Sequence, residues 1–301
     1  MFSRLTVAAV AVAWLALIAH GAAQTARFRS GVDTVTVTVT VTDANGRLIS
    51  DLTKDDFEVT EDSVAQPVTQ FTGDRVPVSL GVLLDDSDSM RGTRIVDART
   101  AFDRFVADLL EPEDEAFVAT FNHAPRMVKG WKQPPATLAH ALDGVKPSGG
   151  TAIYDALVAV APMLDRRTNI RAAIVVISDG RDTASDRTLQ QAREIIRRTD
   201  AFVYAIAIDD ADARESTRIN PDALRDITGP SGGYTEVVRG ADDLGPATER
   251  IANELNHQYT LGYSATRPPD GSWRNIRVHV KTHDEYRTRA RRGYYADAAK
   301  F

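Results

Sequence analysis

The residues best suited to chemistry form three short polar stretches that lie far apart in the chain. The first, Asp85-Asp86-Ser87-Asp88-Ser89-Met90, follows an apolar run at residues 78–84, and the others are Gly149-Gly150-Thr151 and Ser178-Asp179-Gly180. An Asp-x-Ser-x-Ser sequence at the end of a strand places one carboxylate and two hydroxyls on a tight loop. Hard oxygen ligands of this kind suit Mg²⁺, Mn²⁺ or Ca²⁺. The pattern therefore predicts a site for a divalent cation.

The segment that must position these residues alternates between strand and helix patterns. Apolar runs predict strands at residues 78–84, 115–121, 127–130, 172–177, 202–208 and 233–237. Helices are predicted at residues 93–110, 136–142, 153–164, 186–198, 221–227 and 242–255. Such alternation indicates a mostly parallel sheet with helices on both faces. Ligands bind at the carboxyl ends of the strands in sheets of this type, and the three polar stretches lie at that edge.

Both flanks of this α/β segment are rich in strand signals. Residues 35–42 are four Val-Thr repeats, whose period of two places the valines on one side and the hydroxyls on the other. Further short strands are expected at residues 57–60, 68–71 and 259–263, and residues 276–281 and 286–295 are expected to form a hairpin. Each flank is too small a sheet to stand alone. We therefore expect residues 24–75 and 257–301 to pair into one β-sandwich-like domain, with a domain of residues 76–256 inserted between them.

Composition indicates a globular, exported protein. The 301 residues are 43% hydrophobic. Arg4, an apolar run at residues 7–18 and Gly21-Ala22-Ala23 are typical of a signal peptide cleaved before Gln24, because the run is too short to span a membrane. We expect a periplasmic or extracellular location and no integral membrane span in the mature chain. There is no cysteine, and the formal net charge of −6 argues against a nucleic-acid partner.

Longer stretches around the three polar motifs resemble a known family. Val82-Leu83-Leu84-Asp85-Asp86-Ser87-Asp88-Ser89-Met90, Val175-Val176-Ile177-Ser178-Asp179-Gly180 and the run from Gly149 to Leu157 together resemble a von Willebrand factor type A (VWA) domain with an intact metal-ion-dependent adhesion site (MIDAS). The likeness covers residues 76–256 and implies a Rossmann-like α/β fold. The flanking stretches at residues 52–59 and 291–296 resemble the ends of the secreted VWFA-related family of acidobacterial type.

The resemblance implies a set of metal ligands and a function. Asp85, Ser87 and Ser89 match the first loop of the family, Thr151 the second and Asp179 the third. In VWA domains the hydroxyls bind Mg²⁺ directly, and the carboxylates act directly or through water. An open coordination position can then accept a Glu or Asp carboxylate of a protein partner. We therefore expect a secreted adhesion module without catalytic activity; a scaffold with a purely structural metal is an alternative.

The first loop departs from the family pattern in one place and carries a further acidic residue. Asp88 stands where glycine is common between the two serines, and Asp86 is also acidic. If either carboxylate turned inward, it would over-neutralise the ion and disfavour a partner carboxylate.

These acidic residues also allow an alternative assignment as an enzyme. Asp86 and Asp88 after an apolar strand resemble the haloacid-dehalogenase phosphatase loop, with Asp86 as nucleophile, Asp88 as acid/base, and Asp209 and Asp210 as metal ligands. That assignment leaves Thr151 and Asp179 without a role. The histidines show no His-Glu-x-x-His spacing for zinc.

Overall fold

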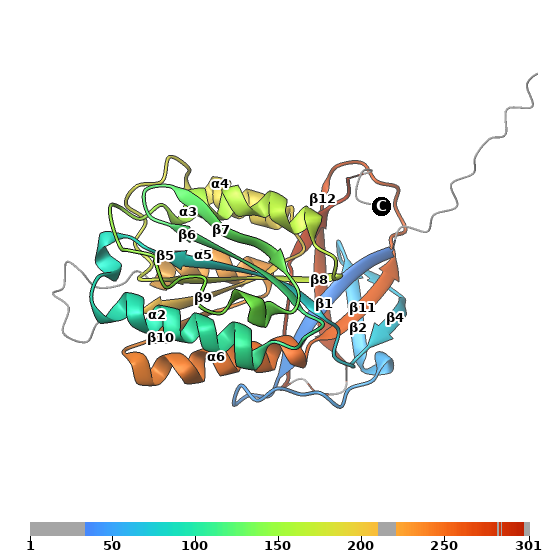
Figure 1. The fold of residues 1–301 in the computed structure, drawn as a ribbon. Helices are drawn as coiled ribbons and strands as arrows, with labels where there is room; N and C mark the ends of the chain where they lie inside the picture. The colour runs from blue at the N-terminus through green and yellow to red at the C-terminus, as the bar shows by residue number, and fades with distance from the viewer. Residues whose placement is uncertain (1–33, 210–220, 282, 284, 298–301) are drawn as a thin grey trace, which may run out of the picture. The chain divides into compact units, whose positions relative to one another are not determined.

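Six strands form a central sheet in the order β10-β9-β8-β5-β6-β7 (Figure 1). Neighbouring strands are parallel except β7, which runs antiparallel to β6 at one edge. The inner strands are continuous apolar runs, as expected for a parallel sheet that is covered on both faces. This sheet confirms the predicted fold class. Its members are β5 (Val78–Asp85), β6 (Glu115–Phe121), β7 (Pro125–Lys132), β8 (Arg171–Ser178), β9 (Phe202–Ile208) and β10 (Thr235–Val238).

The computed structural model describes residues 34–209, 221–281, 283 and 285–297, which belong to one compact unit. The predicted signal peptide, its cleavage point at Gln24 and the following residues to 33 lie outside this described part. Within the described part, no helix combines the length and the apolar character that crossing a membrane requires.

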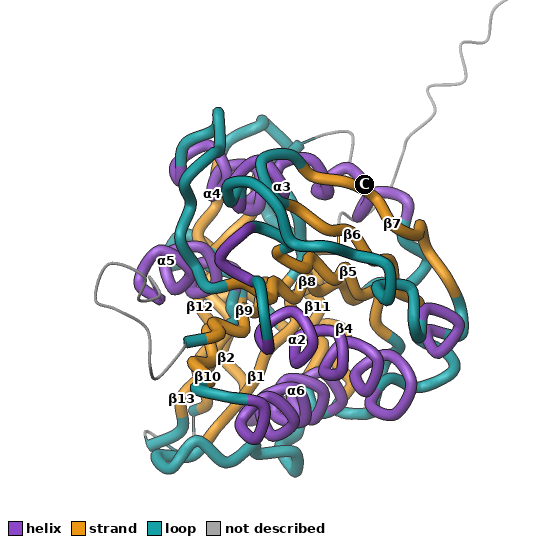
Figure 2. The backbone as a smooth tube through the Cα atoms, turned by 60° about the vertical axis from the view of Figure 1, so that its left-hand side comes forward, coloured by secondary structure: helices purple, strands orange, loops and turns teal. Residues whose placement is uncertain are grey.

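α-Helices cover the two faces of the central sheet, as Figures 1 and 2 show. One apolar cluster joins the sheet to α2 and α6 through residues such as Phe102 and Ile251. A second cluster, on the opposite face, joins it to α3, α4 and α5 through residues such as Leu157, Ile196 and Leu224. The helices are α2 (Thr93–Arg104), α3 (Ile153–Val160), α4 (Leu189–Arg197), α5 (Pro221–Ser231) and α6 (Ala241–Asn256). A π-helical turn (Phe105–Leu109) extends α2, and a 3₁₀ helix (Ala161–Arg166) extends α3.

Two antiparallel four-stranded sheets flank the α/β part, in the orders β13-β1-β11-β4 and β14-β12-β2-β3. Strands from the two ends of the chain pair in both, because β1 lies between β11 and β13, and β2 pairs with β12. The valines of β1 are buried in an apolar cluster shared by both sheets. The strands are β1 (Thr34–Thr42), β2 (Phe57–Glu61), β3 (Val64–Gln66), β4 (Val68–Thr72), β11 (Tyr259–Ser264), β12 (Trp273–Val280), β13 (Arg287–Ala290) and β14 (Gly293–Tyr295).

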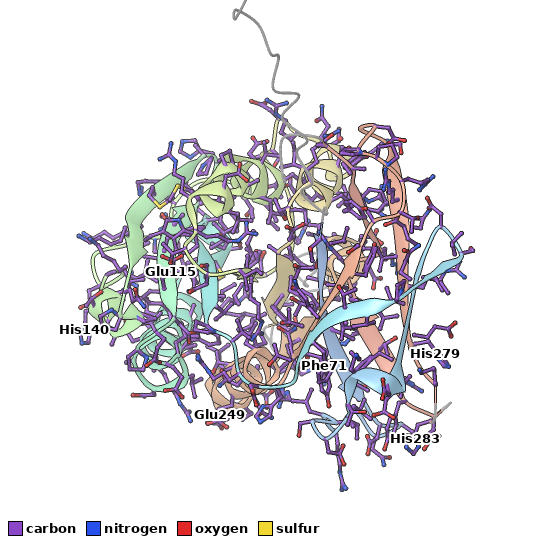
Figure 3. All side chains as sticks on the ribbon, turned by 90° about the vertical axis from the view of Figure 1, so that its right-hand side faces the viewer. Phe71, Glu115, His140, Glu249, His279 and His283 are labelled. Carbon is purple, nitrogen blue, oxygen red and sulfur yellow. The ribbon has the colours of Figure 1, made fainter. Side chains whose placement is uncertain are left out.

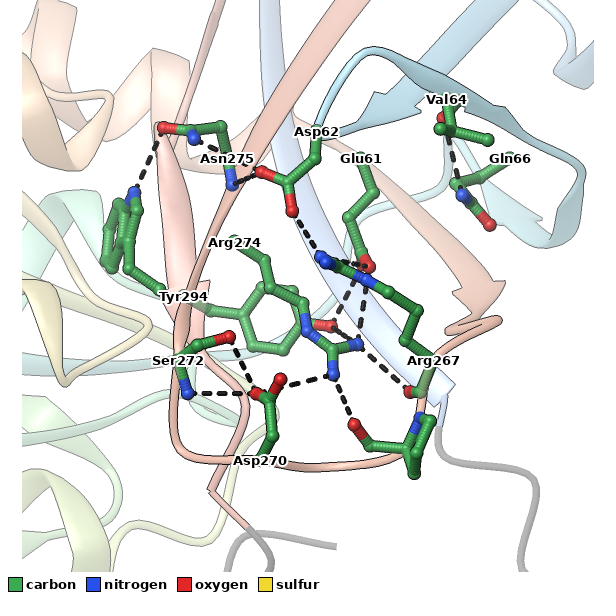
Figure 4. A network of polar contacts seen from close by, with 12 residues as sticks. Glu61, Asp62, Val64, Gln66, Arg267, Asp270, Ser272, Arg274, Asn275 and Tyr294 are labelled. Atoms are coloured by element: carbon green, nitrogen blue, oxygen red, sulfur yellow. Dashed lines mark hydrogen bonds and ion pairs between the residues drawn. The ribbon is translucent and has the colours of Figure 1, made fainter.

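A buried ion pair connects these flanking strands (Figure 4). Glu61 in β2 and Arg274 in β12 have side chains that are each 1% exposed, and their charged groups lie 3.3 Å apart. The hydroxyls of Tyr263 and Tyr294 donate to Glu61 Oε2 at 2.8 and 2.9 Å. The guanidinium also donates to the carbonyl of Pro268 at 2.5 Å. The chain between β11 and β12 is thereby fastened to the flanking sheets.

The hairpin predicted for residues 276–281 and 286–295 is wrong in part. The second run divides into β13, which pairs with β1, and β14, which pairs with β12. The chain changes sheets at Arg291 and Arg292, and Gly293 follows at a point where a Cβ would lie 2.2 Å from the carbonyl oxygen of Arg274. A strand-like pattern cannot show this change, because it does not identify the partner of each strand.

The helix predicted for residues 136–142 is also wrong. This segment contains only a 3₁₀ helix (Pro135–Leu138), followed by turns. His140 has φ of 63°, in the left-handed region, so the helix cannot continue through it.

Candidate functional site

Three loops that carry the predicted site residues meet at the carboxyl edge of the central sheet. β5 ends at Asp85 and β8 ends at Ser178, and these strands are neighbours with Leu84 beside Ile177. The loop before α3 is bonded to the loop after β5, because the Asp88 N–H donates to the Gly149 carbonyl at 2.9 Å. The sheet topology therefore brings together stretches that are up to about ninety residues apart in the sequence.

Asp85 is fully buried, and hydrogen bonds fix both of its carboxylate oxygens. The Ser178 hydroxyl donates to Oδ2 at 2.6 Å, and the Ser87 N–H donates to Oδ1 at 2.9 Å. Burial raises the pKa of Asp85 to about 7, and the charge of Asp179 adds to the rise, whereas the bonds from Ser178 and Ser87 oppose it. This carboxyl group is therefore held in place and, without a nearby cation, carries its proton at neutral pH for part of the time.

The remaining predicted ligands lie on the same loops. Ser87 Oγ and Ser89 Oγ are 2.9 Å apart, with Ser87 buried and Ser89 exposed. Thr151 is 3% exposed, and its backbone is fixed by bonds with Thr183 at 2.8 and 3.0 Å. Asp179 is 1% exposed, and its Oδ1 accepts from the Arg181 N–H at 3.4 Å. The set offers two carboxylates and three hydroxyls, which fit a hard divalent cation and not a soft one.

Asp86 and Asp88 are each engaged by an arginine. Asp86 is 2% exposed and lies 2.8 Å from Arg126 Nη2 of β7, which opposes the rise in the pKa of Asp86 that burial causes. The Asp88 side chain is 57% exposed and pairs with Arg91 at 2.7 Å. Because both carboxylates have guanidinium partners, they do not add charge to the predicted cation position.

Sequence reasoning missed the arginines around the site. Arg94, in the first turn of α2, lies 3.7 Å from Asp179 Oδ2 and donates to the Ser89 carbonyl at 2.7 Å. It thus links two of the three loops. The sequence did contain a signal for Arg94, because it lies five residues after Ser89, in the turn that follows the predicted loop. Arg126 gave a weaker signal, since its place opposite Thr120 follows only from the pairing of β6 and β7.

The geometry gives little support to the phosphatase assignment. The Asp86 carboxylate is buried against Arg126, so a phosphate ester has no direct approach to it as a nucleophile would require. Asp209 follows β9, which is separated from β5 by β8. Asp210 lies outside the described residues.

Another group of metal-ligating side chains lies away from this edge. Asp103, His140 and Asp143 have ligand atoms within 4.8 Å of one another. The His140 side chain is 76% exposed and its ring Nδ1 lies 3.4 Å from Asp103 Oδ2, while the His140 backbone N–H donates to Asp103 Oδ1 at 2.7 Å. Figure 3 shows His140 on the opposite side of the molecule from His279 and His283. We assign this group no function, because an exposed histidine with carboxylate neighbours is common on protein surfaces.

Comparison with known proteins confirms the VWA fold. Residues 80–181 match the family model of the von Willebrand factor type A domain, a range that contains all three loops. Inter-alpha-trypsin inhibitor heavy chain H2 of Mus musculus is 22% identical over 200 residues, which are 61% of this chain and 20% of that protein. The chain thus spans about a fifth of the length of this relative.

Two solved structures extend the likeness to the fold. A von Willebrand factor type A protein from Catenulispora acidiphila is similar at a TM-score of 0.54 and 15% identity, covering 80% of this chain and 63% of that one. Proximal thread matrix protein 1 from the mussel byssus, with a zinc-occupied MIDAS motif, is similar at a TM-score of 0.53 and 17% identity, covering 70% and 50%.

Proposed function

We propose that this protein is a secreted, non-catalytic binding module that holds a divalent cation and uses it to bind an acidic side chain of a partner protein. The ligands are Asp85, Ser87, Ser89, Thr151 and Asp179. The observation that carries the proposal is the fixed carboxylate of Asp85, which is buried and held by Ser178 and Ser87 beside two hydroxyls and a second buried carboxylate.

Mg²⁺ is the cation that the donor set favours, with Mn²⁺ or Ca²⁺ as substitutes. Five side-chain oxygens without nitrogen or sulfur match hard cations, and two carboxylates balance two positive charges. A bound cation would supply a positively charged centre for a Glu or Asp carboxylate of the partner. The zinc-occupied motif of the mussel protein, which has a similar fold, supports a divalent cation in general.

The protein itself would keep the ion accessible and charged. Ser178 and the loop backbone hold Asp85, while Arg126 and Arg91 engage the two additional carboxylates. Ser89 is exposed, so a partner side chain can approach the site from its side.

Calorimetric titration of Mg²⁺ and Mn²⁺ into the mature chain tests the proposal. We expect saturable binding to one site, which Asp179→Ala abolishes. Asp222→Ala is a matched control, because the Asp222 side chain is 84% exposed and pairs with Arg225, three residues along the same helix. Absence of binding by the wild-type protein would refute the metal site. Binding that raises thermal stability without any cation-dependent capture of acidic peptides would favour a scaffold with a structural metal.

A further inference from the structure

Arg126 has an exposed guanidinium, which is held beside the loop at residues 85–90. Its side chain is 59% exposed, and Nη2 donates to Asp86 Oδ2 at 2.8 Å and to Thr120 Oγ1 at 3.0 Å. Within the described part of the chain, no residue accepts a hydrogen bond from its Nε or Nη1. One side of the guanidinium is thus anchored, and two of its donor atoms remain available to a ligand.

The anchor of this arginine is unusual because it is a buried carboxylate. Asp86 is next to the predicted ligand Asp85, and its backbone is fixed by bonds with the Phe121 carbonyl and the Ser148 N–H, both at 2.8 Å. A pair between a buried acid and a largely exposed arginine contributes little net stability, because burying the acid has a desolvation cost. A gain in stability therefore does not explain why Asp86 is buried against Arg126, whereas the positioning of Arg126 does.

A second arginine on the same loop repeats the arrangement. The Arg91 side chain is 67% exposed, and its Nε and Nη2 bind Asp88 Oδ1 at 2.8 and 2.7 Å. Asp88 stands where the family pattern commonly has glycine, and Asp86 is the other additional acidic residue of this loop. Each orients an exposed guanidinium at the rim of the proposed cation site, in a chain whose formal net charge is −6. The rim therefore carries exposed positive groups, although the protein as a whole is negatively charged.

We infer that the partner offers at least two acidic side chains, one for the cation and a second for Arg126. Hydrogen bonds from a guanidinium to a carboxylate are among the strong ones, and Nη1 of Arg126 can donate one to the second acid. Nη2, which a parallel pair of N–H donors requires, already donates to Asp86 and Thr120. The inference rests on the proposed function, since the first carboxylate binds the metal. Arg126 is then a specificity-determining residue, and Asp86 is the residue that positions it.

Peptides with one or two glutamates provide the test. The immobilised set contains one single-Glu peptide and three double-Glu peptides. In the double-Glu peptides the two acids are adjacent or are separated by one or three alanines. Binding of the full mature chain is measured in Mg²⁺ and in EDTA. We expect the best double-Glu peptide to bind wild-type protein at least tenfold more tightly than the single-Glu peptide. Arg126→Gln should lose this preference. Arg277→Gln, an exposed arginine on β12 of the flanking sheet, should keep it.

Mg²⁺ titrations of the same variants distinguish failure of the Arg126 contact from failure of the metal site. We expect the Mg²⁺ affinities of wild type and Arg277→Gln to agree within about twofold. Arg126→Gln should bind Mg²⁺ at least as tightly as wild type, because it leaves the Asp86 carboxylate without its guanidinium partner. If Mg²⁺ binds but Arg126→Gln keeps the double-Glu preference, the inference is overturned and the metal site stands. If Mg²⁺ does not bind the wild type, the proposed function itself fails. Stronger Arg126-dependent binding to heparin than to any double-Glu peptide would overturn the choice of an acidic polypeptide.

Discussion

Ser178, the last residue of β8, donates a 2.6 Å hydrogen bond to the buried carboxylate of Asp85, the last residue of the neighbouring β5. The same Ser178 oxygen accepts from the Gly180 N–H at 3.0 Å, so the serine also shapes the turn that presents Asp179. One hydroxyl thus orients the two carboxylates of the proposed metal site from outside the ligand set.

Replacement of Ser178 by alanine should weaken metal binding without removing a ligand. Groups that orient metal ligands typically change the affinity by about 10- to 100-fold. We expect Ser178→Ala to lower the Mg²⁺ affinity within this range in a calorimetric titration. Ser50→Ala, an exposed serine in the flanking region, should leave the affinity unchanged. An unaltered affinity in Ser178→Ala would show that Asp85 does not depend on this bond.

The stability of the metal-free protein should fall as the pH rises from about 4 to 7. The pKa of Asp85 is raised from 3.8 to about 7 by burial, so the native state retains a proton that the unfolded state has released in this interval. Stability decreases with pH wherever the native state binds more protons. Urea unfolding of the chain in EDTA at several pH values measures the slope. Asp85→Asn should flatten it, while the raised pKa of Asp86 leaves a smaller slope of the same sign.

Loss of the buried glutamate in the flanking sheets should destabilise the protein strongly. Glu61→Ala leaves Arg274 as a buried charge without its carboxylate and removes the acceptor of two tyrosine hydroxyls. Breaking a buried pair from one side costs about 3–5 kcal/mol of unfolding free energy. Urea unfolding followed by circular dichroism should show this loss. Glu58→Ala, an exposed glutamate on the same strand, should change the free energy by less than about 0.5 kcal/mol.

A second buried glutamate should couple the flanking sheets to the α/β part. Glu254 in α6 accepts from Thr40 of β1 and from Tyr204 of β9, both at 2.9 Å, and it pairs with Arg289 of β13. Glu254→Ala should reduce the free energy of unfolding by about 2 kcal/mol or more, since several buried donors lose their acceptor. Glu249→Ala on the same helix is the control, because its side chain is 49% exposed. Equal effects of the two substitutions would contradict this role.

The central sheet and the site loops could be predicted because their signals are local. Apolar runs such as residues 78–84 and 202–208 mark buried parallel strands, and Asp85, Ser87 and Ser89 belong to one short motif. The topology of parallel strands then determines where Thr151 and Asp179 must lie. Whether these five residues bind a metal stays a prediction.

Other features depend on contacts between distant residues, which a single sequence does not show. The partners Glu61 and Arg274 are 213 residues apart. Arg126 reaches Asp86 only because β7 turns back along β6. The run at residues 286–295 divides between two sheets, and nothing in the run itself identifies the two partner strands. Long side chains such as arginine add to the difficulty, since their reach allows many partners.

The pairing of β1 with β11 has a consequence for the order in which the chain is made. Val39 lies opposite Tyr259, so a ribosome that has finished β1 must add about 220 residues before this partner exists, which takes on the order of 10 to 45 seconds. During that interval, the Val-Thr repeat is a β-prone segment without charge or proline, the kind of sequence that associates with other chains. Newly made protein therefore depends on completing its last strands quickly, or on a holding factor that shields the first one.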